Sequence, residues 1–170
     1  LRLFTGKTTF IVKNPENARG LFPNYANADF NTASPEGELT TRNIQSLYNA
    51  SNALSQDSQK NISFKWLVII HGESDAQHFF AAKNYAQNLT AFINKRRLEL
   101  RNPNLPVVIV KLNNTIPLVD YPYLNIIRAA QTSVSSELSN VSLLDNDDVT
   151  MMADGIHFNA AANIRIGSRI

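Results

Sequence analysis

Four short runs of β-branched and aliphatic residues alternate along this 170-residue chain with four longer stretches of helical periodicity. The apolar runs are 8–13, 64–70, 106–112 and 141–144, and the helical stretches are about 36–58, 76–100, 123–138 and 158 onward. A run that is apolar nearly throughout, such as 64–70, is typical of a strand buried on both faces of a parallel sheet. This order therefore predicts an α/β fold of three layers, with helices on both faces of a parallel sheet.

Composition excludes several classes of function. The chain has 44% hydrophobic and 18% charged residues, as a globular domain does. It has no cysteine, which rules out disulfide scaffolds and thiolate metal sites. A net charge of +2, with 95–97 as the only basic run, does not predict a nucleic-acid partner. The longest apolar run, 66–70, is too short for a membrane span, and no phosphate-binding glycine motif indicates a nucleotide cofactor.

The polar turn 71–75 follows the second apolar run, at the edge of the sheet where ligands bind in such folds. Its simplest role is to cap the next helix through Ser74 or Asp75. Alternatively, 72–76 resembles a nucleophile elbow, with Ser74 as nucleophile and His157 as base. The orienting acid would then be one of three aspartates in a later loop: Asp145, Asp147 and Asp148.

A second candidate site is Asp154-Gly155-Ile156-His157, in the loop before the last helical stretch. A carboxylate three residues before a histidine can accept a hydrogen bond from the ring Nδ1 and leave Nε2 able to take a proton. Alternatively, Asp154 is a turn residue and His157 a packing group. A metal site is not expected, because the acids and histidines at 71–78 lack a matched second ligand pair.

Several segments resemble the sialate O-acetylesterase and carbohydrate acetylesterase branch of the SGNH hydrolases. Residues 66–76 resemble the family's W-x-QGESDA segment, and 154–159 resemble its closing segment. The remaining similar parts are 10–13, which match its second strand, 89–106, Arg128 with Gln131, and Gly167 with Arg169. The resemblance implies a carbohydrate O-acetylesterase that acts by serine acyl transfer on acetylated sugars or polysaccharides, without a cofactor.

By this resemblance, His157 is the catalytic base, Asp154 its orienting acid, and Glu73 the acid of the family's QGE motif. The family nucleophile lies in a Gly-Gln-Ser-Asn motif after the first strand, and this motif does not occur in the chain. We therefore expect 1–170 to be the C-terminal major part of one hydrolase domain. Its nucleophile would lie upstream of residue 1 or on a separate polypeptide, or would have been lost.

The chain also departs from the family pattern. His71 replaces the family's glutamine, and Gly20 is the nearest counterpart of its oxyanion-binding glycine turn. His71, Gly72 and Gly20 are therefore the candidate substrate or oxyanion residues. The loop 14–34 is either a wall facing the sugar or a surface insertion. Two other functions stay open, an esterase with Ser74 as nucleophile and an inactive carbohydrate-binding domain.

Localisation is expected to be extracellular or periplasmic. The glycosylation pattern Asn-x-Ser/Thr occurs at five positions, namely Asn49, Asn61, Asn88, Asn113 and Asn140. About half or more of these matches are expected by chance in a chain so rich in Asn, Ser and Thr, so they are compatible with secretion without establishing it.

Overall fold

The computed structural model describes residues 2–4, 7–9, 38–58 and 63–170. Its elements are β1 (Arg2–Phe4), β2 (Lys7–Thr9), α1 (Glu38–Ser58), β3 (Leu67–Ile70), the 3-10 turn η1 (Asp75–Gln77), α2 (Phe79–Glu99), β4 (Val107–Val110), α3 (Leu124–Glu137), β5 (Val141–Leu144) and α4 (Ala160–Arg169). The predicted alternation of strands and helices from 36 onward is confirmed.

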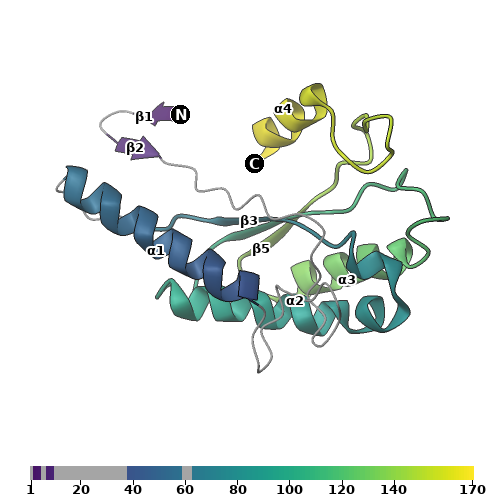
Figure 1. The fold of residues 1–170 in the computed structure, drawn as a ribbon, viewed down its shortest axis with the longest axis horizontal. Helices are drawn as coiled ribbons and strands as arrows, with labels where there is room; N and C mark the ends of the chain where they lie inside the picture. The colour runs from purple at the N-terminus through teal and green to yellow at the C-terminus, as the bar shows by residue number, and fades with distance from the viewer. Residues whose placement is uncertain (1, 5–6, 10–37, 59–62) are drawn as a thin grey trace.

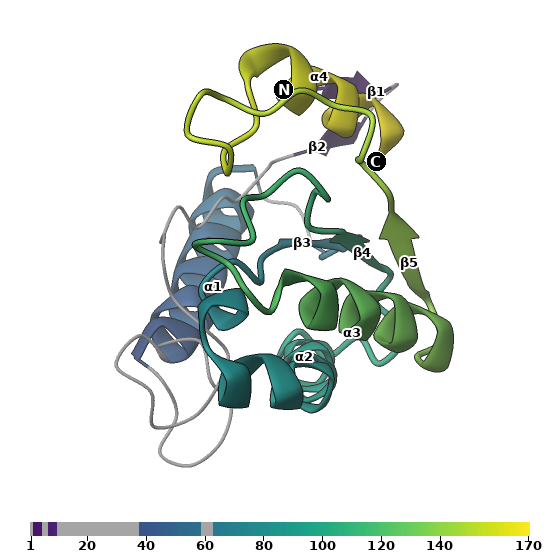
Figure 2. The ribbon, with the colours of Figure 1, turned by 90° about the vertical axis from the view of Figure 1, so that its right-hand side faces the viewer.

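A parallel sheet with the order β3-β4-β5 forms the centre of the fold. Helices α2 and α3 lie on one face of this sheet and α4 lies on the other (Figures 1 and 2). The protein is therefore an α/β fold with helices on both faces, as predicted. Because the strands are parallel, all three end at the same edge, where the loops carrying 71–75 and 154–157 begin.

The two faces of the sheet differ in how much they bury. On one face, Tyr85, Leu89 and Ile93 of α2 are fully buried, together with Ile127 of α3. The three α2 residues recur four positions apart, which places them on one side of that helix. On the other face the buried cluster is smaller: Val110, Leu144, Val149, Ala162 and Ile166. Helix α4 contributes the last two of these.

The strand 64–70 was expected to be buried on both faces, and this is wrong, because Ile69 is the one buried residue of this segment. Trp66 and Ile70 are each 51% exposed. In the part of the chain that the structure describes, β3 has one hydrogen-bonded neighbour, β4, so it lies at an edge of the sheet. Edge strands are less covered than central ones.

The helix expected from residue 76 begins at Phe79 instead. His78 has an extended backbone (φ −134°, ψ 126°), which separates the 3-10 turn η1 from α2. The strand expected at 8–13 is also different where it is described, because β2 pairs with β1 in a separate antiparallel hairpin. Two residues separate these strands, and so short a connection cannot join parallel ones. Residues 10–13, the loop 14–34 and Gly20 lie outside the described residues.

Candidate active site

Asp154 and His157 are in contact in the loop between β5 and α4. The His157 ring Nδ1 lies 2.7 Å from Asp154 Oδ2. The backbone N–H groups of Ile156 and His157 both donate to Asp154 Oδ1 at 3.0 Å. One carboxylate therefore fixes the ring and the turn that carries it. When Nδ1 holds the proton of this hydrogen bond, Nε2 keeps its lone pair and can accept a proton.

The local sequence explains why the loop turns here. Gly155 has φ +72°, in the left-handed region that favours glycine, and a Cβ at this position would lie 3.1 Å from the Pro117 side chain. The His157 carbonyl accepts from the Met152 N–H at 2.7 Å, which closes the turn. Asn159 then caps α4 by accepting from the Ala162 N–H at 2.8 Å.

The pKa of Asp154 is lowered to about 2, first by the backbone hydrogen bonds from His157 and Ile156 and then by the His157 ring. The carboxylate is consequently ionised throughout the neutral range. An ionised carboxylate on Nδ1 favours the imidazolium that forms when Nε2 takes a proton. The His157 side chain is 67% exposed, so incoming molecules can reach it.

The three other aspartates considered as orienting acid pair with basic side chains. Asp145 lies 3.2 Å from Lys111 Nζ, and Asp147 accepts two hydrogen bonds from Arg128 at 2.8 and 2.7 Å. Asp148 binds the guanidinium groups of two α4 arginines, Arg165 and Arg169. Among these acids and Asp154, His157 hydrogen-bonds to Asp154.

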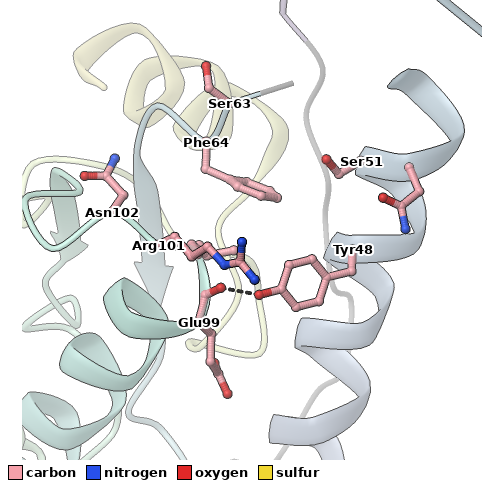
Figure 3. A pocket seen from close by; sticks show the side chains of 9 residues that line it. Tyr48, Ser51, Ser63, Phe64, Glu99, Arg101 and Asn102 are labelled. Atoms are coloured by element: carbon pink, nitrogen blue, oxygen red, sulfur yellow. Dashed lines mark hydrogen bonds between the residues drawn. The ribbon is translucent and has the colours of Figure 1, made fainter. Parts of the chain in front are cut away.

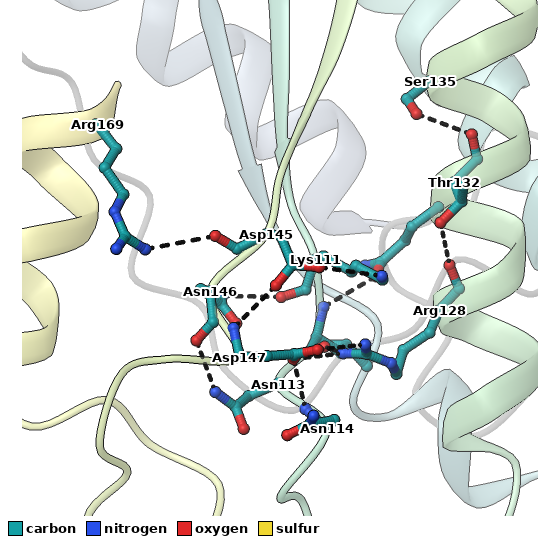
Figure 4. A network of polar contacts seen from close by, with 12 residues as sticks. Lys111, Asn113, Asn114, Arg128, Thr132, Ser135, Asp145, Asn146, Asp147 and Arg169 are labelled. Atoms are coloured by element: carbon teal, nitrogen blue, oxygen red, sulfur yellow. Dashed lines mark hydrogen bonds and ion pairs between the residues drawn. The ribbon is translucent and has the colours of Figure 1, made fainter.

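The loops after β4 and β5 are joined by a polar network that is buried at Asn113 and Asn146 (Figure 4). Asn113 Nδ2 donates to the Asn146 carbonyl, and Asn146 Nδ2 donates to the Lys111 carbonyl, both at 2.8 Å. The Asn114 N–H donates to Asp147 at 2.9 Å. These contacts satisfy the buried backbone groups where the strands end, and they hold the two loops together.

The turn after β3 carries the other candidates. Gly72 has φ +135°, whereas Ser74 has an ordinary helical backbone (φ −63°, ψ −37°). A nucleophile elbow places its serine on a strained turn before an α-helix. Here the residue with a positive φ is Gly72, a glycine that adopts it without strain, and Ser74 precedes the short turn η1. Among the described residues, the Ser74 hydroxyl makes no hydrogen bond.

Tyr121 is an electrostatic neighbour of both this turn and the Asp154 loop. Burial raises its pKa, and so do the carboxylates of Glu73, Asp120 and Asp154, in that order. Two contacts also join the loop that carries Tyr121 to both segments. The Tyr123 N–H donates to the Ala76 carbonyl at 3.0 Å, and Pro117 contacts the Gly155 turn. Glu73 and Asp154 are therefore both electrostatic neighbours of one phenol. Sequence reasoning missed Tyr121, because no motif or spacing marks this loop.

His71 faces the protein interior. Its ring is stacked on that of Tyr85, with centroids 6.2 Å apart, and its Nδ1 lies 3.9 Å from the buried Asp75 carboxylate. Gly72 is buried directly after it. Within the described ranges, no group of three His, Asp or Glu side chains is placed to hold a metal ion, and no helix is long and apolar enough to cross a membrane.

A crevice of about 500 Å³ lies where the strands begin, at the opposite end of the strands from the Asp154 and His157 loop (Figure 3). Tyr48 of α1 and Phe64 line it, together with Arg101 and Asn102 after α2. The Tyr48 hydroxyl donates to the Glu99 carbonyl across it. None of the predicted site residues lines this crevice.

Comparison with known protein families identifies the family of this chain. Residues 33–170 match the family described as carbohydrate esterase, sialic acid-specific acetylesterase. The chain belongs to this family of carbohydrate esterases. The match covers the 71–75 turn and the Asp154–His157 pair within one family unit, and it confirms the resemblance found in the sequence.

Two proteins resemble the chain, one of them in sequence and both in fold. A probable carbohydrate esterase of Arabidopsis thaliana is 27% identical over 103 residues, which are 61% of this chain and 37% of that protein. The crystal structure of the Arabidopsis protein has a TM-score of 0.63 and 23% identity over 77% of this chain and 49% of that one. The crystal structure of a carbohydrate acetylesterase from Xanthomonas citri has a TM-score of 0.53 and 22% identity over 62% of this chain and 24% of that one. The chain thus matches well under half the length of this curated relative.

Proposed function

We propose that this carbohydrate esterase is an O-acetylesterase that removes acetyl groups from sugars or polysaccharides. The observation that carries the proposal is the hydrogen bond between His157 Nδ1 and the ionised Asp154 carboxylate. The family match and the acetylesterase named among the structural relatives support the ester class. The reaction is acyl transfer, in which an activated serine takes the acetyl group and water then releases acetate.

In this mechanism, His157 Nε2 takes the proton of the serine hydroxyl and returns it to the leaving sugar oxygen. Asp154 holds the ring in the required tautomer and stabilises the imidazolium. Glu73, the acid of the QGE motif in the resemblance, adds a negative charge near Tyr121 and would organise the site from the turn after β3.

The nucleophile is a serine upstream of residue 1, in the Gly-Gln-Ser-Asn motif that the chain lacks. Residues 1–170 are then the larger, C-terminal part of one hydrolase domain. Among the described residues β3 pairs only with β4, and this supports the arrangement, since a further strand could pair at its other side. Backbone donors near His71, Gly72 and Gly20 would hold the oxyanion. An extracellular or periplasmic location is part of the same proposal.

Acetate release from acetylated saccharides tests the proposed reaction. We expect the complete protein to release acetate from O-acetylated oligosaccharides and to act less on esters of longer acyl chains. Proton NMR of the acetyl resonance measures both rates on the same sample. Absence of acetate release from any acetylated sugar would refute the proposal. The alternative would then be an inactive carbohydrate-binding domain, and a glycan-binding measurement would test it.

A fluorophosphonate probe identifies the nucleophile. We expect peptide mapping of the complete protein to place the label on a serine upstream of residue 1, and residues 1–170 alone to stay unlabelled. A label on Ser74 in both proteins would instead identify Ser74 as the nucleophile. The Ser74→Ala variant of the complete protein is the matched control, and it should keep its label.

A further inference from the structure

Two α3 side chains one helical turn apart bind the carboxyl ends of all three parallel strands. Arg128 and Gln131 are three residues apart, so they lie on the same face of the helix. The Arg128 guanidinium donates to the Leu112 carbonyl after β4 and pairs with Asp147 after β5. Gln131 reaches in the other direction, to the end of β3.

The contacts of Gln131 use both ends of its amide. Its Nε2 donates to the His71 carbonyl at 2.9 Å, and its Oε1 accepts from the Leu112 N–H at 2.9 Å. The donor and acceptor partners fix the orientation of this amide, and the side chain is fully buried. Gln131 therefore joins the first residue after β3 to the end of β4.

The connection that Gln131 makes between the ends of β3 and β4 is rigid, because the surrounding atoms leave no space for the backbone to move. The Tyr85 hydroxyl also donates to the His71 carbonyl, at 2.9 Å, and Tyr85 is fully buried. At Gly72, a Cβ would lie 2.8 Å from the Ile127 side chain and 3.2 Å from the Tyr85 hydroxyl. The peptide between residues 71 and 72 is thus held by two donors and tightly packed on one side.

We propose that Gln131 is a positioning residue of the acetylesterase site, which sets where the turn carrying Glu73 stands relative to the loops after β4 and β5. The inference rests on the proposed function. Gln131 acts through the His71 carbonyl and the Leu112 N–H and is fully buried, so its effect falls on the geometry of the reacting groups. Loss of this contact should lower kcat more than it raises KM.

The Gln131→Glu variant gives this proposal a signature that a simple loss of stability lacks. A protonated carboxyl can donate to the His71 carbonyl and accept from the Leu112 N–H, whereas a carboxylate can only accept. Burial and the nearby carboxylates of Glu73 and Asp75 should raise the pKa of the introduced carboxyl, as they raise that of Tyr85. Arg128, whose charge would lower it, is paired with Asp147.

The experiment measures the kcat of variant and wild type across pH in the complete protein. The ratio of Gln131→Glu to wild type cancels the pH dependence that the two proteins share. We expect this ratio to fall by about tenfold between about pH 5.5 and 8.5, with KM within about threefold of wild type. Gln131→Met is similar in length but cannot make either hydrogen bond. Its kcat should be lower than that of wild type by a similar factor at every pH. Thermal melts at each pH confirm that both variants are folded.

A pH-independent ratio for Gln131→Glu, or a Gln131→Met kcat within about twofold of wild type, overturns the inference. Should either variant fail to fold, Tyr85→Phe replaces it, because it removes one donor to the His71 carbonyl and keeps the ring. Its kcat should fall about threefold to tenfold at constant KM, and an unchanged kcat overturns the proposal. A wild type that releases no acetate instead refutes the proposed function, and this control is read before any variant.

Discussion

At the scale of single residues, the site depends on a few groups whose conformation the sequence enforces. Asp154 accepts three hydrogen bonds from its own turn, and the positive φ of Gly155 makes that turn possible. The sequence alone predicted this pair, because a spacing of three residues across a glycine is a local constraint. The roles of Tyr85 and Tyr121 could not be predicted, since their partners lie far away in the chain and no local pattern indicates them. Gln131 was part of the resemblance together with Arg128, but its contacts with His71 and Leu112 could not be predicted from the sequence.

The Asp154→Asn variant tests the pair directly. An amide can donate to Nδ1 and so stabilise the wrong tautomer, which leaves Nε2 protonated. We expect kcat for acetate release to fall by about a thousandfold, with KM little changed. Asp145→Asn is the matched control from the start of the same loop, because Asp145 pairs with Lys111, and it should keep its rate. Equal rates for the two variants would contradict the assignment of Asp154.

The Gly72→Ala variant tests the packing of the turn after β3. The added Cβ meets the Ile127 side chain at 2.8 Å at a backbone φ of +135°. We expect the free energy of unfolding in urea to fall by about 2 kcal/mol or more. Gly167→Ala is the control, because its Cβ would meet nothing within 4 Å in α4, and it should be neutral or stabilising. Equal stability of the two variants would show that the turn tolerates a side chain.

At the scale of elements, local pattern predicted most helices and strands and missed some of their ends. The helix predicted from residue 76 begins at Phe79 because His78 is extended. Tertiary contacts decide that boundary, since the Tyr123 N–H binds the Ala76 carbonyl within the preceding turn. The burial of β3 was misjudged for the same reason. An apolar strand sequence does not show whether the strand lies inside a sheet or at its edge.

The attachment of α4 should depend on pH through Asp148. Its pKa is lowered to about 2 by the Arg169 hydrogen bonds and the Arg165 charge. A folded-state pKa below the ordinary 3.8 means that the stabilisation is complete above about pH 4 and is lost as pH falls toward 2. The melting temperature of wild type should therefore exceed that of Asp148→Asn at pH 6, and the difference should shrink toward pH 2. A difference that stays constant with pH would contradict this role.

At the scale of the whole molecule, the α/β class and the position of the site at the carboxyl edge of the sheet followed from the order of elements. The nucleophile could not be placed, because its motif is absent from the chain. The proposed completion of the domain predicts that an upstream strand covers β3, where Trp66 is half exposed. Acrylamide should quench Trp66 less in the complete protein than in residues 1–170, with Trp66→Phe giving the background. Equal quenching would argue against pairing at this edge.

The measurement that tests the central claim most directly is the kcat/KM for acetate release from an O-acetylated oligosaccharide, compared between the complete wild-type protein and its His157→Ala variant. If His157 is the base, the kcat/KM of the variant is lower by about a thousandfold or more. Its melting temperature stays close to that of wild type, since the side chain is exposed. A folded His157→Ala protein that releases acetate within about tenfold of the wild-type rate would contradict the account.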